Sequence, residues 1–239
     1  MSADFKCILV EQRGTGKSYP AVYDSSTLSV ALTLDDFEAI RDQLGLEKWN
    51  VLGFSFGGYL ASLYAHFYPD SVSSLVLLDS MGLNTDAFGH FMDNITSGMC
   101  AEDQERFDFW NDPVRKEADA KHALVERIRA MMPGYFYDRE KSLLVSEVMK
   151  DSDFNFELGA FIWADIEKRK LDLAQMEPVF SGPVLILHGR QDPLGESVAQ
   201  SLLGYYEKAG LEFVERAGHY SWIEQPAKTK ESIKIFLKK

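Results

Sequence analysis

Short apolar runs alternate with longer helical patterns along this chain, and this alternation constrains the fold more than any other feature. The runs are about as long as a strand, are bounded by turn residues, and cover residues 5–10, 49–54, 74–79, 184–188 and 212–215. Helical spacing covers residues 34–44, which follow Thr33 as an N-cap, and residues 56–68, 196–208 and 227–237. Apolar strands separated by helices form parallel sheets covered on both faces. The sequence therefore predicts an α/β fold.

The alternation stops between residues 83 and 182, where helical patterns follow one another. We expect a helical cap here, inserted into an α/β core of residues 1–82 and 183–239, because functional insertions occur in loops at strand ends. The cap is rich in aromatic side chains, which could line a substrate pocket or form the core of the cap itself. They are Phe107, Phe109, Trp110, Phe136, Phe154, Phe156, Phe161 and Trp163.

Charge and cysteine content exclude several classes of protein. The 239 residues carry a formal net charge of −12, whereas nucleic acid is held mainly by Lys and Arg, so we expect no nucleic-acid partner. Cys7 and Cys100 match no metal-binding or redox spacing and are expected to be free thiols. There is no apolar run of about 18 residues, and the first residues lack the apolar core of a signal peptide. The sequence predicts a cytoplasmic protein without a membrane partner, metal or cofactor.

A Gly-x-Ser-x-Gly pattern at Gly53, Ser55 and Gly57 lies where a predicted strand meets a predicted helix. Such a turn is so tight that flanking side chains would collide, and we expect Gly53 and Gly57 to supply the room. The turn exposes the serine hydroxyl at the helix N-terminus and directs the Phe56 N–H toward the developing oxyanion. We predict Ser55 as a nucleophile with the Phe56 N–H as oxyanion donor. The alternative is a glycine-rich turn with an incidental serine.

A serine hydroxyl needs a neighbouring base, and His219 is the best candidate among the histidines. It follows the last predicted strand, and Gly218 marks the turn that leaves this strand. A loop in this position can reach the strand ends where the serine lies. His188 ends an apolar run and is expected to pack in or just above the sheet. The remaining histidines fall within helical patterns and are expected to be structural; they are His66, His90 and His122.

Two carboxylates compete for the role of orienting the base. Asp192 lies in a polar turn after the penultimate predicted strand and gives the chain order Ser, Asp, His. Asp79 ends the strand that follows the nucleophile helix, so its carboxylate could reach the same imidazole. Chain order and turn context favour Asp192, which would fix the tautomer of His219 and stabilise the imidazolium.

Several of these segments together resemble the proline iminopeptidase-like branch of the α/β hydrolases, a serine aminopeptidase family. Residues 11–18 look like its D-Q-R-G-x-G-x-S loop, with Glu11 in place of the usual Asp. Residues 53–58 match its nucleophile elbow, residues 188–193 its acid loop, and residues 218–226 its histidine loop and final helix. The likeness covers nearly the whole chain outside the cap.

The N-terminus departs from the family pattern. In the family, strands and a His-Gly-Gly-Pro-Gly type loop precede the D-Q-R-G segment, and here the chain begins almost at that segment. That loop normally supplies the second oxyanion donor, whose loss typically costs about a hundredfold to a thousandfold in turnover. We therefore expect Met1 to be an internal methionine of a longer protein, or the gene to be truncated.

The resemblance implies release of an N-terminal residue, often proline, from a small peptide through an acyl-enzyme, with cap carboxylates binding the amino group. Candidate carboxylates are Glu126, Glu140, Glu147, Asp153, Glu157 and Asp165, although charges on helices are usually solvated. A carboxylesterase or amidase with the same triad and a small acyl substrate is the first alternative. A non-catalytic or truncated scaffold is the second. A serine at the elbow disfavours dehalogenase and epoxide hydrolase chemistry, because those relatives use an aspartate there.

Overall fold

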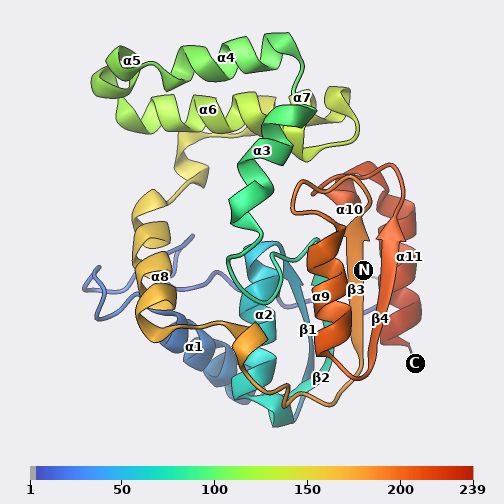
Figure 1. Ribbon diagram of the computed structural model, residues 1–239. Helices are drawn as coiled ribbons and strands as arrows, with labels where there is room; N and C mark the ends of the chain where they lie inside the picture. Colours follow the sequence, from blue (N-terminus) through green and yellow to red (C-terminus); the bar gives the residue numbers. More distant parts are fainter. Residues whose placement is uncertain (1–3, 239) are drawn as a thin grey trace.

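The computed structural model describes residues 4–238 (Figure 1). Its strands are β1 (Trp49–Phe54), β2 (Val72–Leu78), β3 (Val184–Gly189) and β4 (Ala209–Val214). Its helices are α1 (Val30–Gln43), α2 (Phe56–Phe67), α3 (Phe88–Gly98), α4 (Ala101–Asn111), α5 (Pro113–Ala118), α6 (Ala120–Tyr135), α7 (Arg139–Val148), α8 (Phe156–Arg169), α9 (Glu196–Tyr205), α10 (Ser221–Glu224) and α11 (Pro226–Leu237). Short 3₁₀ turns cover Pro69–Ser71, Asp151–Asp153 and Leu173–Gln175.

Within the described residues, the strands form one parallel sheet in the order β1-β2-β3-β4. Leu52 of β1 lies opposite Val76 of β2, which lies opposite Leu185 of β3. Because the strands are parallel, their carboxyl ends meet at one edge of the sheet, and the residues that follow each strand are brought together there. The predicted α/β class, a parallel sheet flanked by helices, is confirmed.

Successive side chains of each strand point to opposite faces of the sheet, and each face has its own apolar cluster. On one face, Leu75 and Ile186 pack in the larger cluster, to which helices α1, α2, α8 and α9 contribute. On the other face, Val76 and Leu187 pack with Ile233 of α11. The sheet is therefore the middle layer between two helical layers (Figure 1).

The long stretch between β2 and β3 is helical, and its helices divide into two sets. Helices α3 to α7 stand beyond the carboxyl edge of the sheet and pack on one another, partly around Ile95 of α3 (Figure 1). A Cβ on Gly134 of α6 would lie 2.3 Å from the carbonyl oxygen of Ile95, so the backbones of α3 and α6 approach closely. Helix α8 instead buries Leu158 and Ile162 in the larger cluster beside the sheet. The proposed boundaries of the cap, residues 83 and 182, stay a prediction.

The predicted strand at residues 5–10 is wrong. This segment pairs with none of the described strands, and Leu9 is 95% exposed. An extended segment becomes a strand only beside a partner that accepts its backbone hydrogen bonds, and the segment has none in the structure. Instead Asp4 forms an ion pair of 2.7 Å with Lys234 of α11. Strand β1 is consequently an edge of the sheet, and Leu52 is 48% exposed.

The first helix begins earlier than predicted. Helix α1 starts at Val30 with Ser29 as its N-cap, whose side chain accepts the N–H of Leu32. Thr33, the predicted cap, lies inside the helix, and its hydroxyl donates to the carbonyl of Ser29 at 2.9 Å. This back-bonding is the usual accommodation of a threonine within a helix.

The other predicted strands and helices are present with ends shifted by a few residues, as frayed termini commonly are. Cys7 and Cys100 are free thiols, as predicted. Among residues 4–238, no helix combines the length and the apolar character required to cross a membrane.

Candidate active site

Ser55 occupies a strained turn between β1 and α2. Its φ of 53° and ψ of −122° lie in a region that non-glycine residues rarely adopt, a strain of about 1–3 kcal/mol. A Cβ on Gly53 would lie 2.1 Å from the carbonyl oxygen of Gly57, so a side chain is excluded at residue 53 as predicted. The same requirement predicted for Gly57 is wrong, because a Cβ there would meet no atom within 4 Å. The second crowded position is Gly58, whose Cβ would lie 2.5 Å from Oγ of Ser80.

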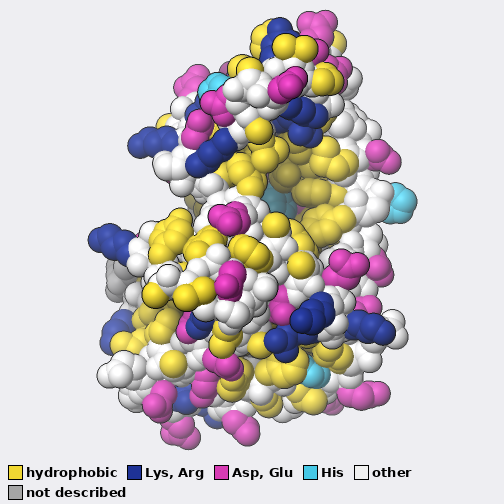
Figure 2. All heavy atoms as spheres, turned by 90° about the vertical axis from the view of Figure 1, so that its left-hand side faces the viewer, with side chains coloured by type: hydrophobic (Ala, Val, Ile, Leu, Met, Phe, Trp, Pro, Cys, Tyr) yellow, Lys and Arg dark blue, Asp and Glu magenta, His cyan; other side chains and the backbone are white. Residues whose placement is uncertain are grey.

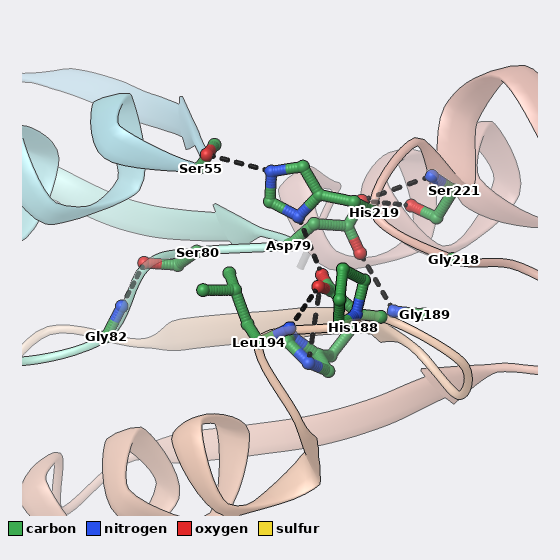
Figure 3. A network of polar contacts seen from close by, with 12 residues as sticks. Ser55, Asp79, Ser80, Gly82, His188, Gly189, Leu194, Gly218, His219 and Ser221 are labelled. Carbon is green, nitrogen blue, oxygen red and sulfur yellow. Dashed lines mark hydrogen bonds and ion pairs between the residues drawn. The ribbon is translucent and has the colours of Figure 1, made fainter. Parts of the chain in front are cut away.

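Ser55, His219 and Asp192 are brought into one hydrogen-bonded line (Figure 3). The Oγ of Ser55 lies 2.9 Å from Nε2 of His219. Nδ1 of His219 lies 2.9 Å from Oδ2 of Asp192, whose Oδ1 accepts the N–H of Leu194 at 2.8 Å. An imidazole nitrogen facing a carboxylate carries the proton, which leaves Nε2 free to accept the serine proton. Phe56 is the first residue of α2, so its N–H has no acceptor inside the helix.

The carboxylate and the imidazole of this line stabilise each other's charge. Burial alone would raise the pKa of Asp192, but the charge and the hydrogen bond of His219 lower it overall. Burial alone would lower the pKa of His219, but the charge and the hydrogen bond of Asp192 raise it overall. Both side chains are buried, His219 being 4% exposed and Asp192 5% exposed. The pair is therefore arranged to accept a proton from Ser55.

Asp79, the rival carboxylate, makes no hydrogen bond to His219. Its Oδ1 accepts the N–H of Gly189 at 2.8 Å, and its Oδ2 accepts the N–H and the hydroxyl of Ser221 at 3.2 and 2.6 Å. The structure thus places Asp192, and not Asp79, on the imidazole. The catalytic roles of Ser55, His219, Asp192 and the Phe56 N–H stay predictions.

Among the described residues, the other histidines make no hydrogen bond to the Ser55 hydroxyl. His66, His90 and His122 are on α2, α3 and α6 as predicted. His188 is fully buried near the end of β3, with Nε2 3.8 Å from Oδ2 of Asp192 and no hydrogen-bond partner at either ring nitrogen among the described residues. Burial lowers the pKa of His188, which favours the neutral ring beside Asp192 and His219.

Cap residues anchor the backbone around His219, a feature that sequence reasoning missed. The N–H of His219 donates to the carbonyl of Tyr135, the last residue of α6, at 2.7 Å. The carboxylate of Glu224 accepts the N–H of Gly218 at 2.6 Å and that of Asp138 at 2.8 Å. The sequence signal was weak: Glu224 stood in the histidine-loop likeness, but nothing near Tyr135 indicated a main-chain contact.

Aromatic side chains surround the hydroxyl and the imidazole. Ring centroids of Phe54, Tyr135 and Phe91 lie 5.0, 5.7 and 6.4 Å from that of His219. Phe56 of α2 meets Trp163 of α8 at 5.2 Å. Figure 2 shows a hollow between the cap and the core, lined mainly by hydrophobic side chains with a histidine at its base.

Of the predicted aromatic stripe, only some members lie near the nucleophile. Trp163 contacts Phe56 and also Phe88, the latter at a centroid distance of 5.5 Å. Phe107 instead packs against the cluster inside the cap, and Phe154 and Phe156 stack on each other at 5.7 Å. The interpretation as cap core therefore holds for Phe107, and the pocket interpretation suits Trp163.

Two of the six predicted amine-binding carboxylates of the cap pair with arginines. Glu126 accepts hydrogen bonds from Arg106 and Arg129. Asp165 accepts the N–H of Val30 at 2.9 Å and pairs with Arg169 at 2.7 Å. The other four candidates are exposed: Glu140, Glu147, Asp153 and Glu157.

Among the residues that the structure describes, one group of side chains brings three potential cation ligands together. Asp79, His188 and Asp192 each offer one ligand atom within 4.8 Å of the others. Both carboxylates already accept hydrogen bonds, Asp79 from Gly189 and Asp192 from His219. These contacts match the support of a hydrogen-bonded triad better than an open coordination site.

Comparisons with known proteins agree with the observed fold. A family model described as the alpha/beta hydrolase fold matches residues 2–226. Abhydrolase domain-containing protein abhd-5.2 of Caenorhabditis elegans is 28% identical over 211 residues, which are 82% of this chain and 44% of that protein. The proline iminopeptidase of Neisseria gonorrhoeae is 37% identical over 75 residues, 30% of this chain and 23% of that enzyme. The chain thus spans less than half the length of either relative.

Solved structures show the same fold. An alpha/beta fold family hydrolase from Bacillus anthracis superposes with a TM-score of 0.71 at 22% identity, covering 94% of this chain and 79% of that one. A meta-cleavage product hydrolase from Pseudomonas fluorescens gives a TM-score of 0.68 at 20% identity, covering 95% and 78%.

Proposed function

The chain belongs to the α/β-hydrolase fold family, and we propose that it is a serine hydrolase that works through an acyl-enzyme. One observation carries the proposal: Ser55 Oγ, the His219 imidazole and the Asp192 carboxylate form a continuous line with both hydrogen bonds at 2.9 Å. This line lies at the strand ends of an α/β sheet, where such families carry out their chemistry.

In the proposed reaction, Oγ of Ser55 attacks the carbonyl carbon of an ester or amide while Nε2 of His219 takes its proton. The Phe56 N–H donates to the oxyanion of the tetrahedral intermediate. His219 then protonates the leaving group, and the acyl group stays on Ser55. Water, deprotonated by His219, releases the acid and restores the serine. Asp192 holds the imidazole and stabilises its charged form throughout.

The surroundings favour an apolar acyl group, and we propose esters of apolar carboxylic acids as the substrate class. Phe91 and Tyr135 flank the imidazole, while Phe56 and Trp163 stand beside the nucleophile turn. Burying apolar substrate surface against such rings stabilises the complex. The rings carry no negative charge for an ammonium group, which could interact only with the faces of the rings. The arginine partners of Glu126 argue further against a cap carboxylate dedicated to an amine.

An aminopeptidase of the proline iminopeptidase type is the second candidate. It is favoured by the 37% identity over 75 residues to the Neisseria gonorrhoeae enzyme. The two candidates share the triad and differ in what the cap recognises.

Labelling with a fluorophosphonate tests the chemistry, because the probe reacts only with an activated serine. We expect one labelled residue, Ser55, with labelling abolished in Ser55→Ala and in His219→Ala. Ser201→Ala is the matched control, since this exposed serine on α9 is outside the site. A wild-type chain that stays unlabelled would favour a non-catalytic scaffold.

A paired substrate assay separates the two candidates. We expect kcat/KM for aryl esters of medium-length or aromatic acids to exceed that for a prolyl arylamide, and Trp163→Ala to lower the former through KM. Faster turnover of the prolyl arylamide would replace the esterase proposal with the aminopeptidase one.

A further inference from the structure

We propose that Asp79 is a positioning residue whose buried carboxylate ties the loop bearing Asp192 to the loop bearing His219. It follows the last residue of β2, between the strand that leads to Ser55 and the strand that leads to Asp192. The inference rests on the proposed function, because it concerns the same triad. It assigns Asp79 a positioning role that the proposed reaction steps do not include.

Three donors converge on this carboxylate (Figure 3). Gly189 N–H binds Oδ1 at 2.8 Å, and Ser221 binds Oδ2 through its N–H at 3.2 Å and its hydroxyl at 2.6 Å. Gly189 is the last residue of β3 and stands three residues before Asp192. Ser221 begins α10 and stands two residues after His219. One side chain therefore fixes both ends of the imidazole–carboxylate pair.

The local backbone is arranged for this contact at a conformational cost. Asp79 is 0% exposed and has a φ of 44°, in the left-handed region that residues other than glycine rarely adopt. A carboxylate kept in such a conformation without solvent needs strong compensating contacts. The three donors supply them, and an ordinary core position would be filled more stably by an apolar side chain.

Asp79 also shapes the electrostatics of the triad. The titratable groups that face it are Asp192, His188 and His219. Burial raises the pKa of Asp79, and the negative charge of Asp192 raises it further, to about 7. The charge of Asp79 in turn adds to that of Asp192 in raising the pKa of His219. A buried carboxylate too far from the imidazole to act on its charge would leave the titration of His219 unchanged.

The test compares Asp79→Asn with Asp103→Asn. Asparagine keeps the shape of Asp79, but its NH₂ group cannot accept the Ser221 N–H. We expect kcat to fall about tenfold to a hundredfold, as small misplacements of a reacting group do, with KM within about twofold. The acid limb of the pH–rate profile should move to lower pH. Asp103 is a buried carboxylate, 5% exposed and held by Arg139 in the cap, and Asp103→Asn should lower Tm without moving the profile.

An NMR titration of the ring of His219 makes the test independent of turnover. In Asp79→Asn we expect the ring to titrate at lower pH, and the Nδ1 proton shared with Asp192 to exchange faster with water. If no ester or amide is hydrolysed by the wild type, the proposed function fails while this titration still reports on Asp79.

Two results would overturn the inference. One is an Asp79→Asn variant with kcat within twofold of wild type and an unchanged His219 titration. The other is a fall in rate that is fully explained by a smaller fraction of folded protein, as expected for Asp103→Asn. Should Asp79→Asn not fold, Ser221→Ala decides: it removes one donor and keeps the N–H, and we expect about a fivefold lower kcat. Wild-type kcat in Ser221→Ala would then refute the role.

Discussion

In the proposed reaction, the imidazole of His219 accepts a proton only while it is neutral, so its pKa would set the lower pH limit of that reaction. Burial lowers this pKa, but the charge and hydrogen bond of Asp192 raise it by more, and the net pKa lies above the usual value. As pH falls through the raised pKa, the ring is protonated and cannot accept the Ser55 proton. We therefore expect kcat/KM to decline as pH falls, and the midpoint of this decline to lie at a higher pH than about 6.5, the ordinary pKa of histidine.

Asp192→Asn reverses that shift and removes the fixed tautomer. We expect the midpoint of the kcat/KM profile to move to lower pH, and kcat to fall by about ten-thousandfold, as in the well-studied serine protease triad. Rate measurements from about pH 5 to 9 on the wild type and on Asp192→Asn check this, with active-site titration by a fluorophosphonate to count the reactive serines. A fully active Asp192→Asn would contradict the assignment of the acid.

The positions of single residues could be predicted where local sequence determines them. The turn at Ser55 is a local event between one strand and one helix, and the sequence placed it correctly. The choice between Asp192 and Asp79 depends on which carboxylate faces an imidazole from another loop, and only chain order bore on it. The requirement for glycine at residue 57 was mistaken because the crowded neighbour of the turn is Ser80, which is distant in sequence and faces Gly58.

At the scale of elements, the junction of β1 and α2 depends on one glycine much more than on another. In Gly53→Ala the new methyl would lie 2.1 Å from the Gly57 carbonyl, and the backbone must move. In Gly57→Ala the methyl meets nothing within 4 Å, and alanine favours the helix by up to about 1 kcal/mol over glycine.

We expect Gly53→Ala to have a lower Tm and to lose fluorophosphonate labelling. We expect Gly57→Ala to keep labelling and to have an equal or higher Tm. Thermal melts and labelling rates of the two variants check this pair. Equal losses in both would show that the turn needs glycine for a reason other than the contact with Gly57.

The four strands that pair in the sheet were predicted from their apolar runs. The segment at residues 5–10 has a similar run but no paired strand among those described, and its prediction was wrong. Residues 5–10 have the apolar composition of a strand, but composition does not reveal whether another strand lies alongside. Helix α1 shows the complementary limit: both Ser29 and Thr33 can cap, and the choice depends on how the chain enters the helix.

At the scale of the whole molecule, two apolar interiors are separate enough to respond separately to mutation. Ile95 is fully buried inside the cap, and Leu75 is fully buried beside the sheet. Replacing either with alanine should cost about 2–5 kcal/mol of stability. We expect Ile95→Ala to speed amide exchange in α3, α4 and α6 while the sheet stays protected, and Leu75→Ala to speed exchange throughout.

Hydrogen exchange followed by mass spectrometry of peptides gives the measurement. Equal loss of protection in the sheet of Ile95→Ala would mean that cap and core unfold as one unit. Sequence patterns predicted a helical stretch between residues 83 and 182, but not that α8 contacts α1 and joins the apolar cluster beside the sheet. That packing depends on contacts between Leu158 and side chains more than a hundred residues away.

The anchor between the cap and the base is made by main chain, which bears on how such a protein can evolve. The carbonyl of residue 135 accepts the N–H of His219 whichever side chain that residue carries. Point mutations at residue 135 can therefore change the side chain beside the His219 ring while the main-chain hydrogen bond to His219 stays in place. If the proposed hydrolase function holds, the cap could change its apolar wall beside His219 without losing this hydrogen bond.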